Sequence, residues 1–103
     1  MATKFALKPN PIFKKNVTIP RAGQEPGIVT FSFRHKALEE LSDLEKQEGM
    51  TGKMLVMEIV EAWALPDEFN QENLSLLFSN YPQAQKAVIE AYYEEMLGAR
   101  EKN

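Results

Sequence analysis

The spacing of apolar residues changes once along this chain, and that change limits the possible fold more than any other feature. Before residue 35, apolar side chains tend to alternate with polar ones, as in strands with one buried face. From residue 37 onward they recur at helical spacing. At 103 residues the chain has the usual length of one domain. We therefore predict a single α+β domain over 1–103, with an N-terminal antiparallel β-hairpin packed on a bundle of about four α-helices.

The two ends of the chain are predicted to lack regular structure. Residues 1–12 contain Pro9 and Pro11, and we expect an extended arm because the residue before a proline avoids the helical region. Residues 99–103 are polar and follow Gly98, which is a suitable helix stop. We expect a flexible tail there.

A β-hairpin is predicted over 13–34. One strand covers about 13–19 and the other about 28–34, and the segment rich in proline and glycine between them predicts a long loop. An isolated hairpin is only marginally stable in water, so its apolar face should rest on the helices. The residues expected on that face are Phe13, Lys15, Val17, Ile19, Val29, Phe31 and Phe33.

Four helices are predicted within the helical part, 37–98. They cover about 37–48, 52–65, 71–80 and 82–97. The second is apolar on nearly every side, so it should be buried or covered by a partner. The fourth has two apolar faces, which again indicates deep burial or one face left for a partner. The residues that delimit these helices are Gly49, Thr51, Pro66, Asn70, Pro82 and Gly98.

No group of residues in the sequence indicates catalysis, a metal or a cofactor. The chain has no cysteine, and its single histidine, His35, lies between the strands and the helices without a flanking carboxylate. Glu58 and Glu61 are three residues apart on one helical turn, but paired carboxylates act as acid and base only where their pKa values are driven apart. No phosphate-binding glycine motif and no hydrolase motif is present. We therefore expect a protein that is not an enzyme.

The helices carry more large apolar residues than a domain of this size easily buries. Exposed apolar patches mark interaction sites, tryptophan and tyrosine are enriched at binding hot spots, and methionine offers an adaptable surface. The alternative is that these side chains simply fill the core. We expect a partner in a groove between the second and fourth helices. The candidate contact residues are Met54, Met57, Trp63, Tyr92, Tyr93 and Met96.

Charge is divided unevenly along the chain, whose net charge is −3. Residues 1–36 carry seven basic groups and one acid, and residues 37–103 carry five basic groups and fourteen acids. The basic third permits nucleic-acid binding, but aromatic residues are not interleaved with the basic ones, so we expect none. We favour a solvated strand face that complements the acidic helices of the same domain or of a neighbouring copy. Homo-oligomers are therefore allowed.

Several of these features occur in an order that resembles the tail assembly chaperones of long-tailed phages and prophages. The opening FALKPNPIFK and the strands VTIP and VTFSF begin the resemblance, which covers most of the chain. It implies a non-enzymatic protein of the host bacterial cytoplasm that binds the tape-measure protein, assists tail-tube assembly and is not retained in the virion. The resemblance continues through Trp63, Leu65, Phe69, Glu72, Asn73, Leu74, Tyr81, Pro82, Ala91 and Tyr92.

The resemblance also implies a second, longer product made by a programmed frameshift. Glu101-Lys102-Asn103 can be encoded GAA-AAA-AAC, which contains the slippery heptamer A-AAA-AAC. The expected mode of binding is a helix in a groove. Two alternatives stay open: a structural tail or head–tail component, and a small nucleic-acid-associated protein that uses the basic hairpin. No apolar run approaches the roughly 20 residues that span a membrane, so we expect no membrane partner.

Overall fold

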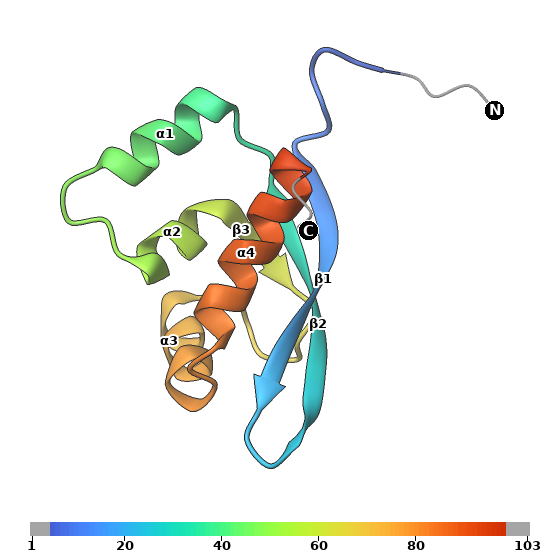
Figure 1. Ribbon diagram of the computed structural model, residues 1–103, viewed down its shortest axis with the longest axis vertical. Helices are drawn as coiled ribbons and strands as arrows, with labels where there is room; N and C mark the ends of the chain where they lie inside the picture. Colours follow the sequence, from blue (N-terminus) through green and yellow to red (C-terminus); the bar gives the residue numbers. More distant parts are fainter. Residues whose placement is uncertain (1–4, 99–103) are drawn as a thin grey trace.

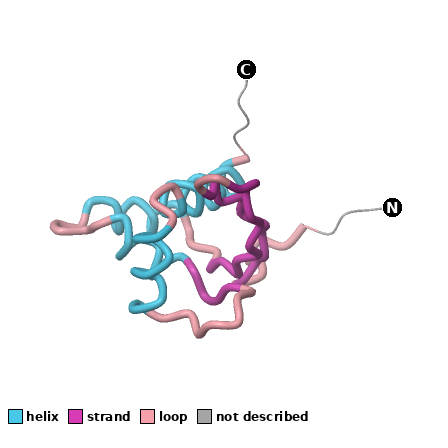
Figure 2. The backbone as a smooth tube through the Cα atoms, turned by 90° about the horizontal axis from the view of Figure 1, so that it is seen from below, coloured by secondary structure: helices cyan, strands magenta, loops and turns pink. Residues whose placement is uncertain are grey.

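A three-stranded antiparallel sheet carries the helices on one of its faces in the computed structural model, which describes residues 5–98 (Figure 1). The view along the sheet shows the strands on one side and the helices on the other (Figure 2). This confirms the predicted α+β class. The predicted tail over 99–103 and the first four residues of the predicted arm lie outside the described residues. The elements are β1 (Ile12–Arg21), β2 (Gln24–Arg34), α1 (Leu38–Lys46), α2 (Gly52–Ile59), β3 (Val60–Trp63), α3 (Gln71–Asn80) and α4 (Ala84–Leu97).

The hairpin has the faces that the alternating pattern predicted. In the ladder between β1 and β2, Phe13 lies opposite Phe33, and Val17 lies opposite Val29. Phe33 and Val17 are buried, as is the neighbouring Phe31. Burying this face against the helices supplies the support that an isolated hairpin lacks.

The connection between the two strands is much shorter than predicted. Both strands continue through the segment rich in proline and glycine to a turn at 22–23, where Gly23 adopts a φ of 72°. A left-handed φ is available to glycine without a steric penalty, which permits the tight turn. The ladder changes register between Ile19 and Arg21. Pro20 lies within that irregularity on an edge strand, where a missing N–H is tolerated.

The helix predicted over 52–65 is wrong in its second half. α2 ends at Ile59, and the next four residues form β3, which pairs with β2 at Phe31–Phe33. Residues such as Val60 and Trp63 suit a strand as well as a helix. The edge of β2 offers these residues backbone partners, and β3 uses them.

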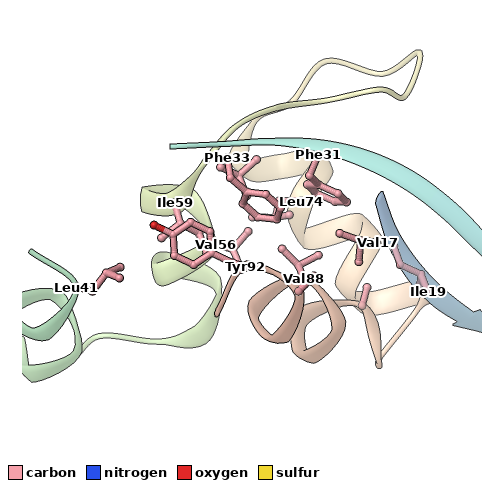
Figure 3. Packing of buried hydrophobic residues seen from close by; sticks show 13 residues of the cluster. Val17, Ile19, Phe31, Phe33, Leu41, Val56, Ile59, Leu74, Val88 and Tyr92 are labelled. Carbon is pink, nitrogen blue, oxygen red and sulfur yellow. The ribbon is translucent and has the colours of Figure 1, made fainter. Parts of the chain in front are cut away.

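The helix α4 lies across the hairpin and, with α2 and α3, closes the core against the sheet (Figures 1 and 3). Its buried face is the predicted one, although the helix begins two residues later than predicted because Pro82 and Gln83 form a turn. Asn70 caps α3 as predicted, accepting a hydrogen bond from the Asn73 N–H at 2.8 Å. The buried cluster consists of Val17, Ile19, Phe31, Phe33, Leu41, Val56, Ile59, Val60, Leu74, Ala84, Val88, Ala91 and Tyr92.

Candidate partner-binding groove

An open cavity of about 470 Å³ lies between the turn end of the hairpin, the segment after β3, and α3. We call it the hairpin–α3 groove. Its wall is mainly apolar, with polar side chains interspersed, a composition typical of binding sites. The lining residues are Ile19, Arg21, Gly27, Ile28, Val29, Trp63, Leu65, Asp67, Asn73, Leu76, Leu77, Asn80 and Tyr81.

Trp63 holds one wall of the groove in place. Its indole Nε1–H donates a hydrogen bond to the carbonyl oxygen of Asp67 at 2.7 Å, which ties the segment after β3 back onto the strand. The indole ring meets Phe69 edge-on at a centroid distance of 5.0 Å, and Phe31 at 6.1 Å. Edge-to-face contacts of this kind are favourable for aromatic pairs. The groove wall is therefore fastened to the core through a side chain that the sequence had singled out.

Two branched aliphatic side chains of the groove are largely exposed to solvent. Ile28 on β2 is 67% exposed, and Leu76 on α3 is 59% exposed. Both residues line the same cavity, Ile28 from the hairpin and Leu76 from α3. Paired exposure of this kind around a concave apolar surface is a mark of an interaction site.

Sequence analysis did not single out either of these residues, although each carries a signal. Ile28 immediately precedes Val29, so it places an apolar side chain on the face of β2 that the alternation assigns to polar residues. Leu76 stands beside the inward-facing Leu77 on α3. Both are therefore apolar residues out of phase with the periodicity that builds the core.

The six predicted contact residues are distributed over the domain. Trp63 lines the hairpin–α3 groove, whereas Met96 lines a second cavity of about 270 Å³ at the base of the arm. Met54 is exposed on α2, and Met57 is partly buried against the core. Tyr92 is completely buried, so its side chain belongs to the core surface of α4. Tyr93, the last of the six, is partly buried and packs against the core.

The helices α2 and α4, between which a groove was predicted, pack directly on each other. The amide group of the Gln85 side chain on α4 lies over Gly52, where an added Cβ atom would be 2.1 Å from Gln85 Nε2, so this side chain fills the space between the two helices there. The larger of the two cavities described here lies instead between the hairpin and α3. The role of the predicted residues in binding stays a prediction.

Both tyrosines of α4 are hydrogen-bonded through their hydroxyl groups. Tyr92 donates to the carbonyl oxygen of Arg34 at 2.9 Å, and Tyr93 donates to the carboxylate of Glu45 on α1. Burial raises the pKa of Tyr92 above its usual value. Burial and the contact with Glu45 raise the pKa of Tyr93. These two bonds join α4 to the end of the hairpin and to α1.

Several basic groups of the hairpin are engaged within the domain. Lys15 forms an ion pair with Glu95 on α4 at 3.2 Å, and Arg34 forms one with Glu61 on β3 at 2.8 Å. The Arg21 guanidinium donates to the carbonyl oxygen of Glu25 at 2.8 Å. These contacts support the interpretation that the basic strands complement acids of the same domain.

The residues weighed for chemistry have structural partners. The His35 ring lies edge-on to Phe13 at 6.4 Å, and its backbone N–H donates to the carbonyl oxygen of Pro11 at 2.8 Å. Among residues 5–98, no three His, Cys, Asp or Glu side chains are grouped to hold a metal ion. No helix in that part of the chain is both long and apolar enough to cross a membrane.

Comparison with known proteins gives one result that covers the entire chain. A family model described as phage tail assembly chaperone matches residues 1–103. No curated protein and no solved structure gives a significant match.

Proposed function

This chain belongs to the phage tail assembly chaperone family, and from that premise we propose that it binds the tape-measure protein in the host cytoplasm and assists tail-tube assembly. Assembly chaperoning is a non-catalytic kind of role. The proposed binding surface is the hairpin–α3 groove. Tail-tube subunits and a frameshift-extended form of the chain are further partners that the family premise suggests.

The observation that supports this surface is the exposure of Ile28 and Leu76 on either side of one apolar cavity. The expected partner segment is a long amphipathic helix, and such a helix inserts apolar residues from successive turns into a groove. Covering the two side chains removes apolar area from water, which is the main source of free energy in most protein association. Arg21 and Asp67, which also line the cavity, offer polar contacts that orient the bound segment.

Co-expression with the tape-measure protein tests the proposal. The wild-type chain should keep the tape-measure protein soluble and co-purify with it. Leu76→Asp should abolish both effects, because it places a charge where apolar area is to be buried. Leu38→Asp is the matched control, since Leu38 is 72% exposed on α1, away from the groove residues.

Three outcomes count against the proposal. The first is no complex with the wild-type chain, which rejects the partner. The second is full binding by Leu76→Asp, which rejects the groove. The third is the chain itself in purified virions by mass spectrometry, because a structural tail component would persist there and an assembly chaperone would not.

A further inference from the structure

We propose that the N-terminal arm of one copy adds as a short β-strand to the hairpin–α3 groove of a second copy, with Phe5 and Leu7 entering the groove. The arm here means residues 5–11. This contact involves two copies of the chain alone, and it forms before any tape-measure protein is bound.

The arm presents apolar side chains that are left uncovered by the described part of its own copy. Phe5 is 91% exposed and Leu7 is 95% exposed. The arm leaves the domain at the end of β1 farthest from the hairpin turn (Figure 1). Phe5 and Leu7 alternate with Ala6 and Lys8, which is the pattern of a strand with one apolar face. An extended segment with this pattern is suited to pairing with an open sheet edge.

The groove contains such an edge. β3 pairs with β2 at Phe31–Phe33, and the N–H of Ala64 then donates to the carbonyl oxygen of Thr30 at 2.9 Å. Toward the hairpin turn, the described residues supply no further strand on this side of β2. Backbone groups of alternate strand residues point to the same side, so the N–H and C=O of Ile28 face the open edge. A strand placed there continues the line of β3.

The spacing of the arm's apolar residues matches the groove. Residues two apart on a strand point to one face about 7 Å apart. Phe5 and Leu7 therefore both face α3 across the groove, near Leu76, while Ala6 and Lys8 point to solvent.

Length requires that the arm come from a second copy. The groove begins near Ile19, and the stretch of β1 from Ile12 to Ile19 spans about 24 Å. Residues 5–11 reach at most about 24 Å when fully extended. An arm folded back along its own β1 would be used up in reaching the groove, with nothing left to pair. A reciprocal exchange between two copies closes into a symmetric dimer.

Sedimentation of the full chain, without a tape-measure protein, tests this inference. The wild type should associate as its concentration rises. Phe5→Ser combined with Leu7→Ser should raise the dissociation constant at least about tenfold, because it removes two buried apolar side chains from each contact. Leu38→Ser combined with Leu97→Ser is the matched control, since it removes two exposed leucines outside the arm and the groove and should leave association unchanged. Circular dichroism establishes that each variant is folded.

A mixing experiment identifies the contact. The arm variant has an intact groove, and Leu76→Glu has an intact arm. Neither should self-associate, but a mixture of the two should form heterodimers. In the wild type, the amide of Ile28 should exchange hydrogen more slowly at high concentration than at low concentration. A monomeric wild type, an arm variant that associates like the wild type, or a mixture without heterodimers would each overturn the inference. Because no tape-measure protein is present, any of these results leaves the proposed function to its own test.

Discussion

Replacing Tyr92 by phenylalanine isolates the hydrogen bond that fixes α4 to the end of the hairpin. The ring of Tyr92 is completely buried, with Phe33 at a centroid distance of 5.2 Å and Phe13 at 5.9 Å. Its hydroxyl donates to the carbonyl oxygen of Arg34 at 2.9 Å. Phenylalanine keeps the ring and removes only the donor. A net hydrogen bond contributes about 1 kcal/mol, and an acceptor left without its donor adds to the loss, so we expect the free energy of unfolding to fall by about 1–2 kcal/mol.

Thermal unfolding followed by circular dichroism measures this loss. In a domain of this size, 1 kcal/mol shifts the melting temperature by about 4–8 °C, so Tyr92→Phe should melt roughly 5–10 °C below the wild type. Urea unfolding should show a lower midpoint with an unchanged slope. Tyr93→Phe is the control, because its hydrogen bond is more exposed and should contribute at most about 0.5 kcal/mol. Equal melting temperatures for Tyr92→Phe and the wild type would refute the reasoning.

The same residue gives stability a dependence on alkaline pH. Burial raises the pKa of Tyr92, whereas the unfolded phenol titrates near pH 10. The contribution of Tyr92 is therefore complete below pH 10, and it declines as the pH rises above that value because only the unfolded state then releases the proton. Tyr93 acts in the same direction, so Tyr93→Phe is compared with the variant that also carries Tyr92→Phe. The double variant should lose stability less steeply above pH 10, and parallel curves would contradict the assignment.

Three further predictions follow from single contacts. Trp63→Phe loses the hydrogen bond to the carbonyl oxygen of Asp67, so urea unfolding should show a free energy of unfolding lower by about 1 kcal/mol. We also expect this variant to capture the tape-measure protein more weakly, and capture equal to that of the wild type would contradict a role of Trp63 in shaping the groove. Asn70→Ala removes the cap of α3 and should lower the free energy of unfolding by about 1 kcal/mol in the same assay. Tyr93→Phe frees α1 from α4, so hydrogen–deuterium exchange should become faster in α1 and stay unchanged in α3.

The parts of the fold that were predicted correctly are those in which burial is recorded in the spacing of residues. One buried face produces alternation in a strand and three- to four-residue intervals in a helix, and this was sufficient for the hairpin faces, for α3 and for the buried side of α4. The residues of β3 show no such spacing pattern. From Met54 to Trp63 most residues are apolar, and an apolar run looks the same in a buried helix and a buried strand. The backbone edge of β2 decides between them, and no local pattern reveals that edge.

The hairpin–α3 groove could not be predicted because it depends on the two features that were missed. Arg21 and Gly27 line it from strand segments that the prediction had left in a loop. Leu65 lines it after β3, where the prediction had continued a helix. The prediction lacked both the long hairpin and the end of α2 at Ile59. It therefore assigned the surplus apolar residues to a groove between two helices. The excess of apolar residues led to the prediction of a binding surface, which stays a prediction, whereas the position of the groove is a property of the assembled sheet.

The two proposals place the arm and the tape-measure protein in one groove, so the two occupants exclude each other. A partner binds only those chains whose groove is open. Its apparent dissociation constant therefore rises as arm exchange lowers the fraction of open grooves. The coupling is reciprocal, because a partner that fills a groove releases the arm that had filled it. Under the two proposals, Phe5 and Leu7 would cover apolar surface while no partner is present, and they would yield it to a longer helix that buries more area. If both proposals hold, mass action alone couples synthesis of the tape-measure protein to the separation of paired chains into single chains that can bind it.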